Sequence, residues 1–208
     1  MVGFAYACSR ASIYGWSTTG EDTYAAQLDL LTKATAINPD YAFAYYVKSL
    51  VLFYTKQLPG AVEAAQTAVA LDPNAAYGYY AMAMAEAWLG RYEQSNGHIK
   101  QAFALSPRDP IGGLWHVILG ISEACLCRLD VAIMEFKRAI DAGYRTYFSY
   151  AYLAAAEAAN GNDAEAKPAL AEARRLNPQL TIKSFAEHVG LPPAIIVEGW
   201  RKAGLPEE

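Results

Sequence analysis

The residue types that carry catalysis or bind metals are few in this sequence, and their spacing does not bring them together. The three histidines, His98, His116 and His188, fall in different predicted helices. None of them has a second ligand at the short interval, such as H-x3-H, that a metal site needs. We therefore predict no metal and no cofactor. His116 is a candidate ligand contact, but a packed or rim histidine is the favoured interpretation.

The cysteines and glycines give no catalytic pattern either. Cys125 and Cys127 lie two residues apart, which is not the C-x-x-C spacing of a redox pair and would point them to different faces of a helix. We interpret them, together with Cys8, as reduced and mostly buried thiols, because free cysteine packs as a small hydrophobic residue. Gly112-Gly113 lacks the Lys-Ser/Thr that completes a phosphate-binding loop. We predict that the chain is not an enzyme.

A carboxylate recurs at the same place in three successive stretches of the sequence, at Glu86, Glu123 and Glu157. Such a row could bind cations. Solvated helix faces are the favoured interpretation, because glutamate is seldom fully buried.

The element that positions these residues is a repeat marked by proline. Pro39, Pro73 and Pro107 follow one another at intervals of 34 residues, each with an alanine five residues before it, and Pro178 ends the same phrase further on. A fixed period of this length is typical of stacked repeats. In each period, a stretch rich in aromatic and small residues precedes a stretch with apolar residues at helical spacing. Each repeat is therefore predicted to be two helices.

One repeat lacks the proline. Tyr144 stands in its place, 37 residues after Pro107, so Arg108-Asp109-Pro110 is an insertion between repeats. We expect the insertion to tilt the last two repeats against the first three and to reshape the surface near Trp88 and Trp115. Uninterrupted stacking would contradict this expectation. The predicted solenoid covers 1–180, with repeats at 8–41 (partial), 42–75, 76–109, 113–146 and 147–180.

The pattern resembles the tetratricopeptide repeat (TPR). Residues Trp88-Leu-Gly-Arg-Tyr92 look like the turn of that family, although Lys56 and Cys127 replace the turn glycine in two repeats and Tyr144 replaces one proline. The resemblance implies an all-α fold, a right-handed superhelical solenoid of antiparallel helix pairs. It also implies a non-catalytic scaffold for protein–protein interaction.

In the family that the chain resembles, the first helices line a concave groove that binds partners. Positions that hold Lys, Asn and Arg in members that clamp a terminal carboxylate hold apolar or aromatic residues here, among them Tyr46, Leu50 and Val117. An apolar peptide or helix is therefore the expected partner, because tyrosine offers a large contact area with a polar tip. The groove candidates by register are Tyr46, Leu50, Phe53, Tyr77, Tyr80, Met84, Trp88, Val117, Ile121, Phe148 and Tyr152.

Residues 181–208 follow the repeats and are predicted to cap them. Thr181 to Val189 suits a short helix, and Pro192-Pro193 can open a second one that ends at Gly204. Trp200 is expected to cover the end of the stack. A cap is needed there because an open solenoid end exposes apolar surface.

The closing phrase Trp200-Arg-Lys-Ala-Gly-Leu-Pro206-Glu is also similar to the end of proteobacterial signalling proteins with a C-terminal TPR region. In those proteins an adenylate/guanylate cyclase domain or a winged-helix domain comes first. This similarity implies an alternative function, a regulatory or sensory segment. A third possibility is a homo-oligomerisation module that uses an exposed apolar face or the N-terminal end of the solenoid.

Charge and hydropathy restrict the partners and the location. Seventeen Lys and Arg residues against 21 Asp and Glu residues give a net charge of −4, which argues against nucleic-acid binding. No stretch reaches the ~18 apolar residues of a membrane span, and residues 1–16 lack the features of a secretory signal. We expect a cytoplasmic protein without a membrane span.

Overall fold

The structure is a computed structural model that describes residues 2–3, 6–7, 24–189 and 192–208. The predictions about Cys8 and about the first half of the first repeat lie outside these residues. Throughout the described ranges the regular structure is helical, which confirms the all-α prediction. The helices are α2 (Tyr24–Ile37), α3 (Ala42–Tyr54), α4 (Leu58–Leu71), α5 (Ala76–Trp88), α6 (Tyr92–Leu105), α7 (Gly112–Cys125), α8 (Leu129–Asp141), α9 (Tyr147–Ala159), α10 (Asp163–Leu176), α11 (Ile182–Val189) and α12 (Ala194–Ala203).

The two helices of each pair are joined by a tight turn with one residue in the left-handed conformation. Gly90 and Gly161 take this conformation with φ of 76° and 83°, and Lys56 and Cys127 take it with φ of 63° and 59°. In each turn, the residue after the left-handed one donates its N–H to the carbonyl of the residue five positions before it. Arg91, for example, donates to the Glu86 carbonyl at 2.9 Å. This bond closes the C-terminus of the first helix. The backbone conformation is thus retained where glycine is replaced.

The proline-containing motif forms the turn between successive helix pairs. Asp72 ends α4 with an extended backbone, and its side chain accepts the N–H of Asn74 at 3.1 Å across Pro73. Proline cannot continue the helix, and the aspartate side chain replaces a lost helical bond. The 34-residue interval therefore marks the point where one pair ends and the next begins.

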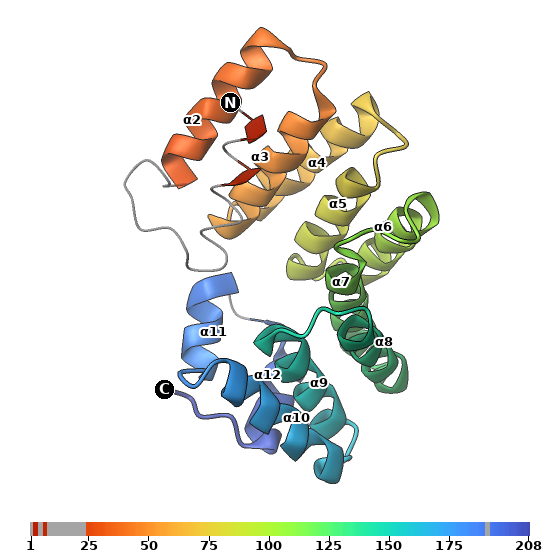
Figure 1. The fold of residues 1–208 in the computed structure, drawn as a ribbon, viewed down its shortest axis with the longest axis vertical. Helices are drawn as coiled ribbons and strands as arrows, with labels where there is room; N and C mark the ends of the chain where they lie inside the picture. Colours follow the sequence, from red (N-terminus) through yellow and green to blue (C-terminus); the bar gives the residue numbers. More distant parts are fainter. Residues whose placement is uncertain (1, 4–5, 8–23, 190–191) are drawn as a thin grey trace.

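The first helices form the inner layer of an arc. Figure 1 shows the helix pairs following one another from α2 at the top to α10 at the bottom, with α11 on the inner side. Direct contacts link α3 to α5, α5 to α7 and α7 to α9, whereas no second helices in the described ranges contact one another as extensively. Within one pair, a small residue permits close packing of the two helices: at Gly120 of α7, a β-carbon would lie 2.6 Å from the ring of Phe136 in α8.

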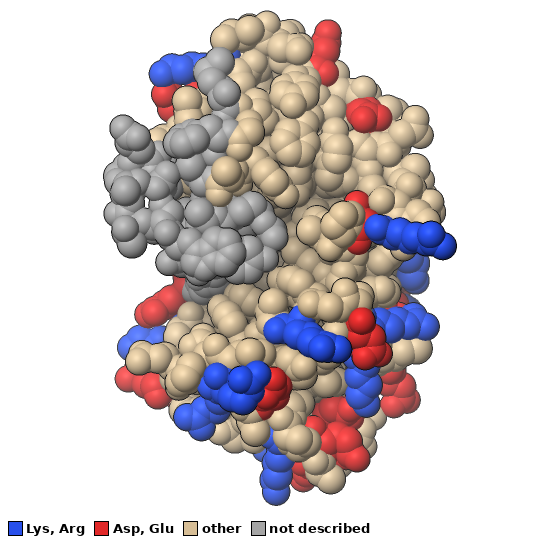
Figure 2. Space-filling model, viewed as in Figure 1, with Lys and Arg blue, Asp and Glu red and all other residues tan. Residues whose placement is uncertain are grey.

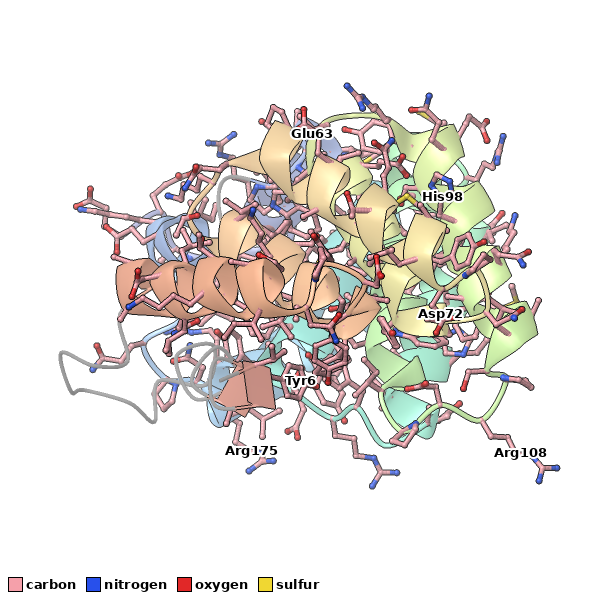
Figure 3. All side chains as sticks on the ribbon, turned by 90° about the horizontal axis from the view of Figure 1, so that it is seen from above. Tyr6, Glu63, Asp72, His98, Arg108 and Arg175 are labelled. Carbon is pink, nitrogen blue, oxygen red and sulfur yellow. The ribbon has the colours of Figure 1, made fainter. Side chains whose placement is uncertain are left out.

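Stacking continues without interruption across the insertion at 108–110. The inserted residues form a turn from Ser106 to Ile111, and Arg108 projects into solvent in Figure 3. Behind the turn, the hydroxyls of Ser95 and Ser122 lie 2.9 Å apart, and the rings of Tyr80 and Trp115 stack at 6.1 Å. The expected tilt of the last two repeats is therefore wrong. A solvent-facing turn absorbs the extra residues, so the helices keep their packing.

The C-terminal residues form the two predicted helices, but their contacts lie mainly on the inner side of the arc. Helix α12 packs chiefly on α9 and also touches α7 and α10. After Gly204, which has φ of 93°, the chain turns back to α11. There the N–H groups of Ile182 and Lys183 donate to the carbonyls of Pro206 and Glu207, at 2.9 and 3.0 Å. These bonds satisfy the free donors at the start of α11.

Charged side chains are unevenly spread over the surface. Figure 2 shows them mainly over the lower half of the molecule, around the later repeats and the C-terminal helices, while the upper half carries few. Of the helices in the described part of the chain, none has the length and apolar character to cross a membrane.

Candidate functional site

The inner layer places the predicted groove residues in two groups. Eight of them are almost completely buried, with Tyr46, Leu50, Tyr80, Val117 and Tyr152 each 2% exposed. Phe53, Met84 and Ile121 are the other three of this group. Tyr77, Trp88 and Phe148 are half-buried. Most of the predicted groove side chains are therefore packed in the core, and three are half-buried.

Aromatic rings cover the N-terminal part of this face. Tyr6 packs edge-on against Phe43, with ring centroids 5.5 Å apart, and lies 6.1 Å from Tyr46. Tyr77 of the next repeat contacts both Phe43 and Tyr46. Figure 3 shows Tyr6 on the opposite side of the molecule from Glu63 and His98, which belong to second helices. Tyr6 thus packs on the inner face of α3.

Trp88 provides an unused hydrogen-bond donor at the middle of the face. Its ring packs edge-on against Phe53 at 5.2 Å. The indole Nε1 is shielded from solvent and finds no acceptor among the described residues. Buried donors nearly always have a partner in native structures. The donor is thus unsatisfied within the described ranges, as is the buried Nε1 of Trp115.

The C-terminal part of the face is occupied by the chain itself. Trp200 of α12 is fully buried, and its Nε1 donates to the Ala151 carbonyl at 2.7 Å. Phe185 of α11 contacts Phe148 and Tyr152 edge-on, at 5.1 and 5.4 Å. Two predicted groove residues therefore already contact a helix, and that helix comes from the same chain.

The sequence did not predict which residues of α9 allow α12 to pack closely against it. At the positions that hold Tyr46 and Leu50 in α3, α9 holds Ala151 and Ala155. A β-carbon on Gly199 would clash with the Ala155 carbonyl oxygen, so α12 lies close against the backbone of α9. The change from large to small residues at equivalent positions was visible in the repeat alignment. Only the fold shows that a glycine distant in sequence faces these alanines.

The recurring carboxylates are buried, and the interpretation as solvated helix faces is wrong. Glu86, Glu123 and Glu157 are 4%, 4% and 2% exposed. Each has partners that compensate for its burial: Glu86 bonds His98 at 2.7 Å, and Glu157 pairs with Lys137 at 2.8 Å. The pairs hold neighbouring helices together, because buried carboxylates require charged or hydrogen-bonding partners.

The pair Glu123 and Asn96 spans two repeats. The amide of Asn96 in α6 donates to Glu123 of α7 at 2.9 Å, and Arg128 donates to the same carboxylate at 3.1 Å. Since the carboxylate is held from both sides, the row of glutamates is a set of structural links between helices.

His116 and Glu135 form another pair of this kind. His116 Nδ1 lies 2.6 Å from Glu135, whose other oxygen accepts from Arg138 at 2.6 Å. Burial opposes ionisation of Glu135, but the hydrogen bonds and charges of His116 and Arg138 outweigh it and lower the pKa of this carboxyl. The favoured interpretation of His116 as a packed histidine agrees with its half-buried position.

The remaining reactive groups are not activated. Burial raises the pKa of the Cys125 thiol to about 11, which favours the unreactive protonated form. Cys127 is exposed, so the prediction that it is buried is wrong: it lies at the left-handed turn position. Within the described ranges, no three His, Cys, Asp or Glu side chains gather to hold a metal ion. His188 lies in α11, but its side chain is outside the described part.

Comparison with known proteins places this fold. No family model matches the chain. A TPR repeat-containing thioredoxin of Arabidopsis thaliana is 31% identical over 85 residues, which is 41% of this chain and 22% of that protein. The chain therefore matches less than a quarter of that relative's length.

Two solved structures show the same architecture. A thermophilic TPR protein of Thermus thermophilus aligns with a TM-score of 0.70 and 23% identity, covering 86% of this chain and 93% of that one. PilW, a type IV pilus biogenesis factor, aligns with a TM-score of 0.73 and 17% identity, covering 97% of this chain and 88% of that one. The fold is that of the TPR solenoids, as the sequence resemblance implied.

Proposed function

We propose that this chain is a non-catalytic scaffold that binds an apolar peptide or helix of a protein partner on the inner face of its repeats. The observation that supports this proposal is the packing of α12 against α9. An amphipathic helix lies on α9 with Trp200 buried and hydrogen-bonded. Laying the apolar face of a helix into a hydrophobic groove is a common mode of peptide recognition.

The predicted groove residues fit this function in two roles. Tyr77, Trp88 and Phe148 lie at the accessible edge and are proposed to contact the partner directly. The eight buried residues are proposed to form the floor that holds these three in place. The ring of Trp88 would add apolar contact area at this edge, since aromatic side chains offer large contact surfaces.

The test uses a displayed library of helical peptides selected against the full chain. Trp88→Ala and Tyr77→Ala alter the edge of the inner face. Gln94→Ala and Gln101→Ala alter exposed positions of α6 and serve as matched controls. We expect the edge variants to weaken binding at least about tenfold, since aromatic anchors dominate such interfaces. Binders that respond only to the α6 variants would contradict recognition by the inner face.

A homo-oligomerisation module is the second candidate, favoured by apolar residues near the N-terminal end of the stack. Ile37 is 73% exposed and Tyr41 is 44% exposed. An apolar patch at the open end of a solenoid can join a second copy. Light scattering over a wide concentration range tests this. A constant monomeric mass excludes it, and a mass that falls in Ile37→Asp supports it.

A regulatory segment of a cyclase-type or winged-helix signalling protein is the remaining proposal, and it rests on the closing phrase alone. In the structure Trp200 packs against α9, which is sufficient reason for a tryptophan at that position. Sequencing the native reading frame tests the proposal: a catalytic or winged-helix domain upstream would support it, and a frame without one would remove it.

A further inference from the structure

The C-terminal unit, defined as the described residues from Thr181 to Glu208, is closed on itself. Besides the two backbone bonds between tail and α11, Lys183 pairs with Glu208 at 3.2 Å and Arg201 with Glu207 at 2.7 Å. Within the unit, the ring of Phe185 lies 4.5 Å from that of Trp200. The two helices and the tail therefore contact one another as well as the repeats.

The C-terminal unit contacts the repeats through a few side chains, and a helix from another protein could carry the same residue types. Trp200 and Gly199 lie against Ala151 and Ala155, and Phe185 lies against Tyr152. The stacking of α2 to α10 uses different contacts, such as those between Ser95 and Ser122 and between Tyr80 and Trp115. Loss of the unit would uncover apolar surface on α9 but would leave the links between the repeats intact.

We infer that the C-terminal unit competes with a partner for the inner face of the repeats. This inference rests on the function proposed above. A partner helix displaces α12 from α9 and takes its place. The chemistry of the partner follows from the occupant: a small residue directly before an aromatic one, as in Gly199-Trp200. The small residue is required by the closeness of the α9 backbone, and the aromatic residue packs against Tyr152 of α9.

The test weakens the packing of α12 on α9 by a substitution in α12, so that the residues of the repeats stay unaltered. Gly199→Ala places a β-carbon against the Ala155 carbonyl, whereas Lys202→Ala alters an exposed position of the same helix and is the control. Hydrogen exchange reports whether α12 leaves α9. The binding probe is a labelled synthetic peptide with the sequence of residues 192–206. A second peptide with alanine in place of Trp200 is its negative control.

We expect Gly199→Ala to raise hydrogen exchange in α12 while α3 to α8 stay protected. The labelled peptide should bind this variant at least about tenfold more tightly than it binds the unaltered chain or Lys202→Ala, and the peptide without tryptophan should bind none of them.

Two results would overturn the inference in different ways. If α12 stays protected in Gly199→Ala, or if α3 to α8 lose protection together with it, the unit is an integral part of the solenoid and not a competitor. The function proposed above is then judged by its own library test. If α12 is released but the peptide does not bind, the inner face of α9 is not a helix receptor, and the proposed function fails there as well.

Discussion

The indole Nε1 of Trp200 donates a hydrogen bond to the backbone carbonyl of Ala151, 2.7 Å away, across 49 residues of sequence. Because Trp200 is fully buried, this bond satisfies a donor that would otherwise be costly to bury. It also fixes the orientation of α12 on α9. The inner face of the last repeat is shaped by this contact.

Removal of the Trp200 side chain is expected to destabilise the protein strongly. Trp200→Ala leaves a cavity between α9, α11 and α12, and the free energy of unfolding should fall by about 3–5 kcal/mol. Trp200→Phe keeps most of the apolar contact but loses the hydrogen bond, so its loss should be smaller. Urea unfolding measures both. Equal losses in the two variants would show that the ring volume is unimportant.

Two glycines in helices should respond to alanine in opposite directions. At Gly97 of α6 a β-carbon meets nothing within 4 Å, so Gly97→Ala should stabilise the protein by about 0.5–1 kcal/mol through helix propensity. At Gly120 of α7 the β-carbon would enter the ring of Phe136, so Gly120→Ala should destabilise it by about 1–3 kcal/mol. The midpoints of thermal unfolding give the signs, and a stabilised Gly120→Ala would contradict the packing described.

The two left-handed residues that are not glycine offer stabilising substitutions. Cys127→Gly and Lys56→Gly should each raise the free energy of unfolding by about 1 kcal/mol, because a β-carbon disfavours positive φ. Gly90→Ala is the reverse change at the equivalent turn and should lower stability. Chemical denaturation of the three variants checks the prediction, which fails if glycine at 56 and 127 is destabilising.

The pair of His116 and Glu135 predicts part of the acid sensitivity. The pKa of Glu135 is lower in the folded chain than its ordinary value of 4.5. A carboxyl with a lowered folded-state pKa stabilises the fold above its unfolded-state pKa, and this contribution is lost as the pH falls through the folded-state value. Stability should therefore decline below about pH 4.5.

Glu135→Gln removes this carboxylate while keeping the side-chain shape, so it isolates the effect. Urea unfolding at about pH 6 and about pH 3.5 should show a large difference between the parent chain and the variant at the higher pH and a smaller one at the lower pH. Glu63→Gln, on an exposed position of α4, is the control. A difference that grows on acidification would contradict the assignment.

Several features of the fold could be predicted from the sequence because they depend on local chemistry. The interval between Pro39, Pro73 and Pro107 marks the turns, since proline ends a helix wherever it occurs. The substitutions at Lys56 and Cys127 kept the turn conformation, because the helix end on either side requires it. Burial of Glu86 and Glu123 could not be predicted, because it depends on partners that the neighbouring helix supplies.

The sequence alone therefore determined the repeat, the helix pairs and the aromatic character of the inner face. Each of these features depends on the short-range spacing of residues and on the preference of residue types for particular backbone conformations. The tertiary structure alone decided that α12 lies on α9 and that Tyr46, Tyr80 and Tyr152 form a buried floor. The reason is physical: which apolar faces cover one another is settled by the path of the whole chain, and Gly199 meets Ala155 only because α12 folds back onto α9.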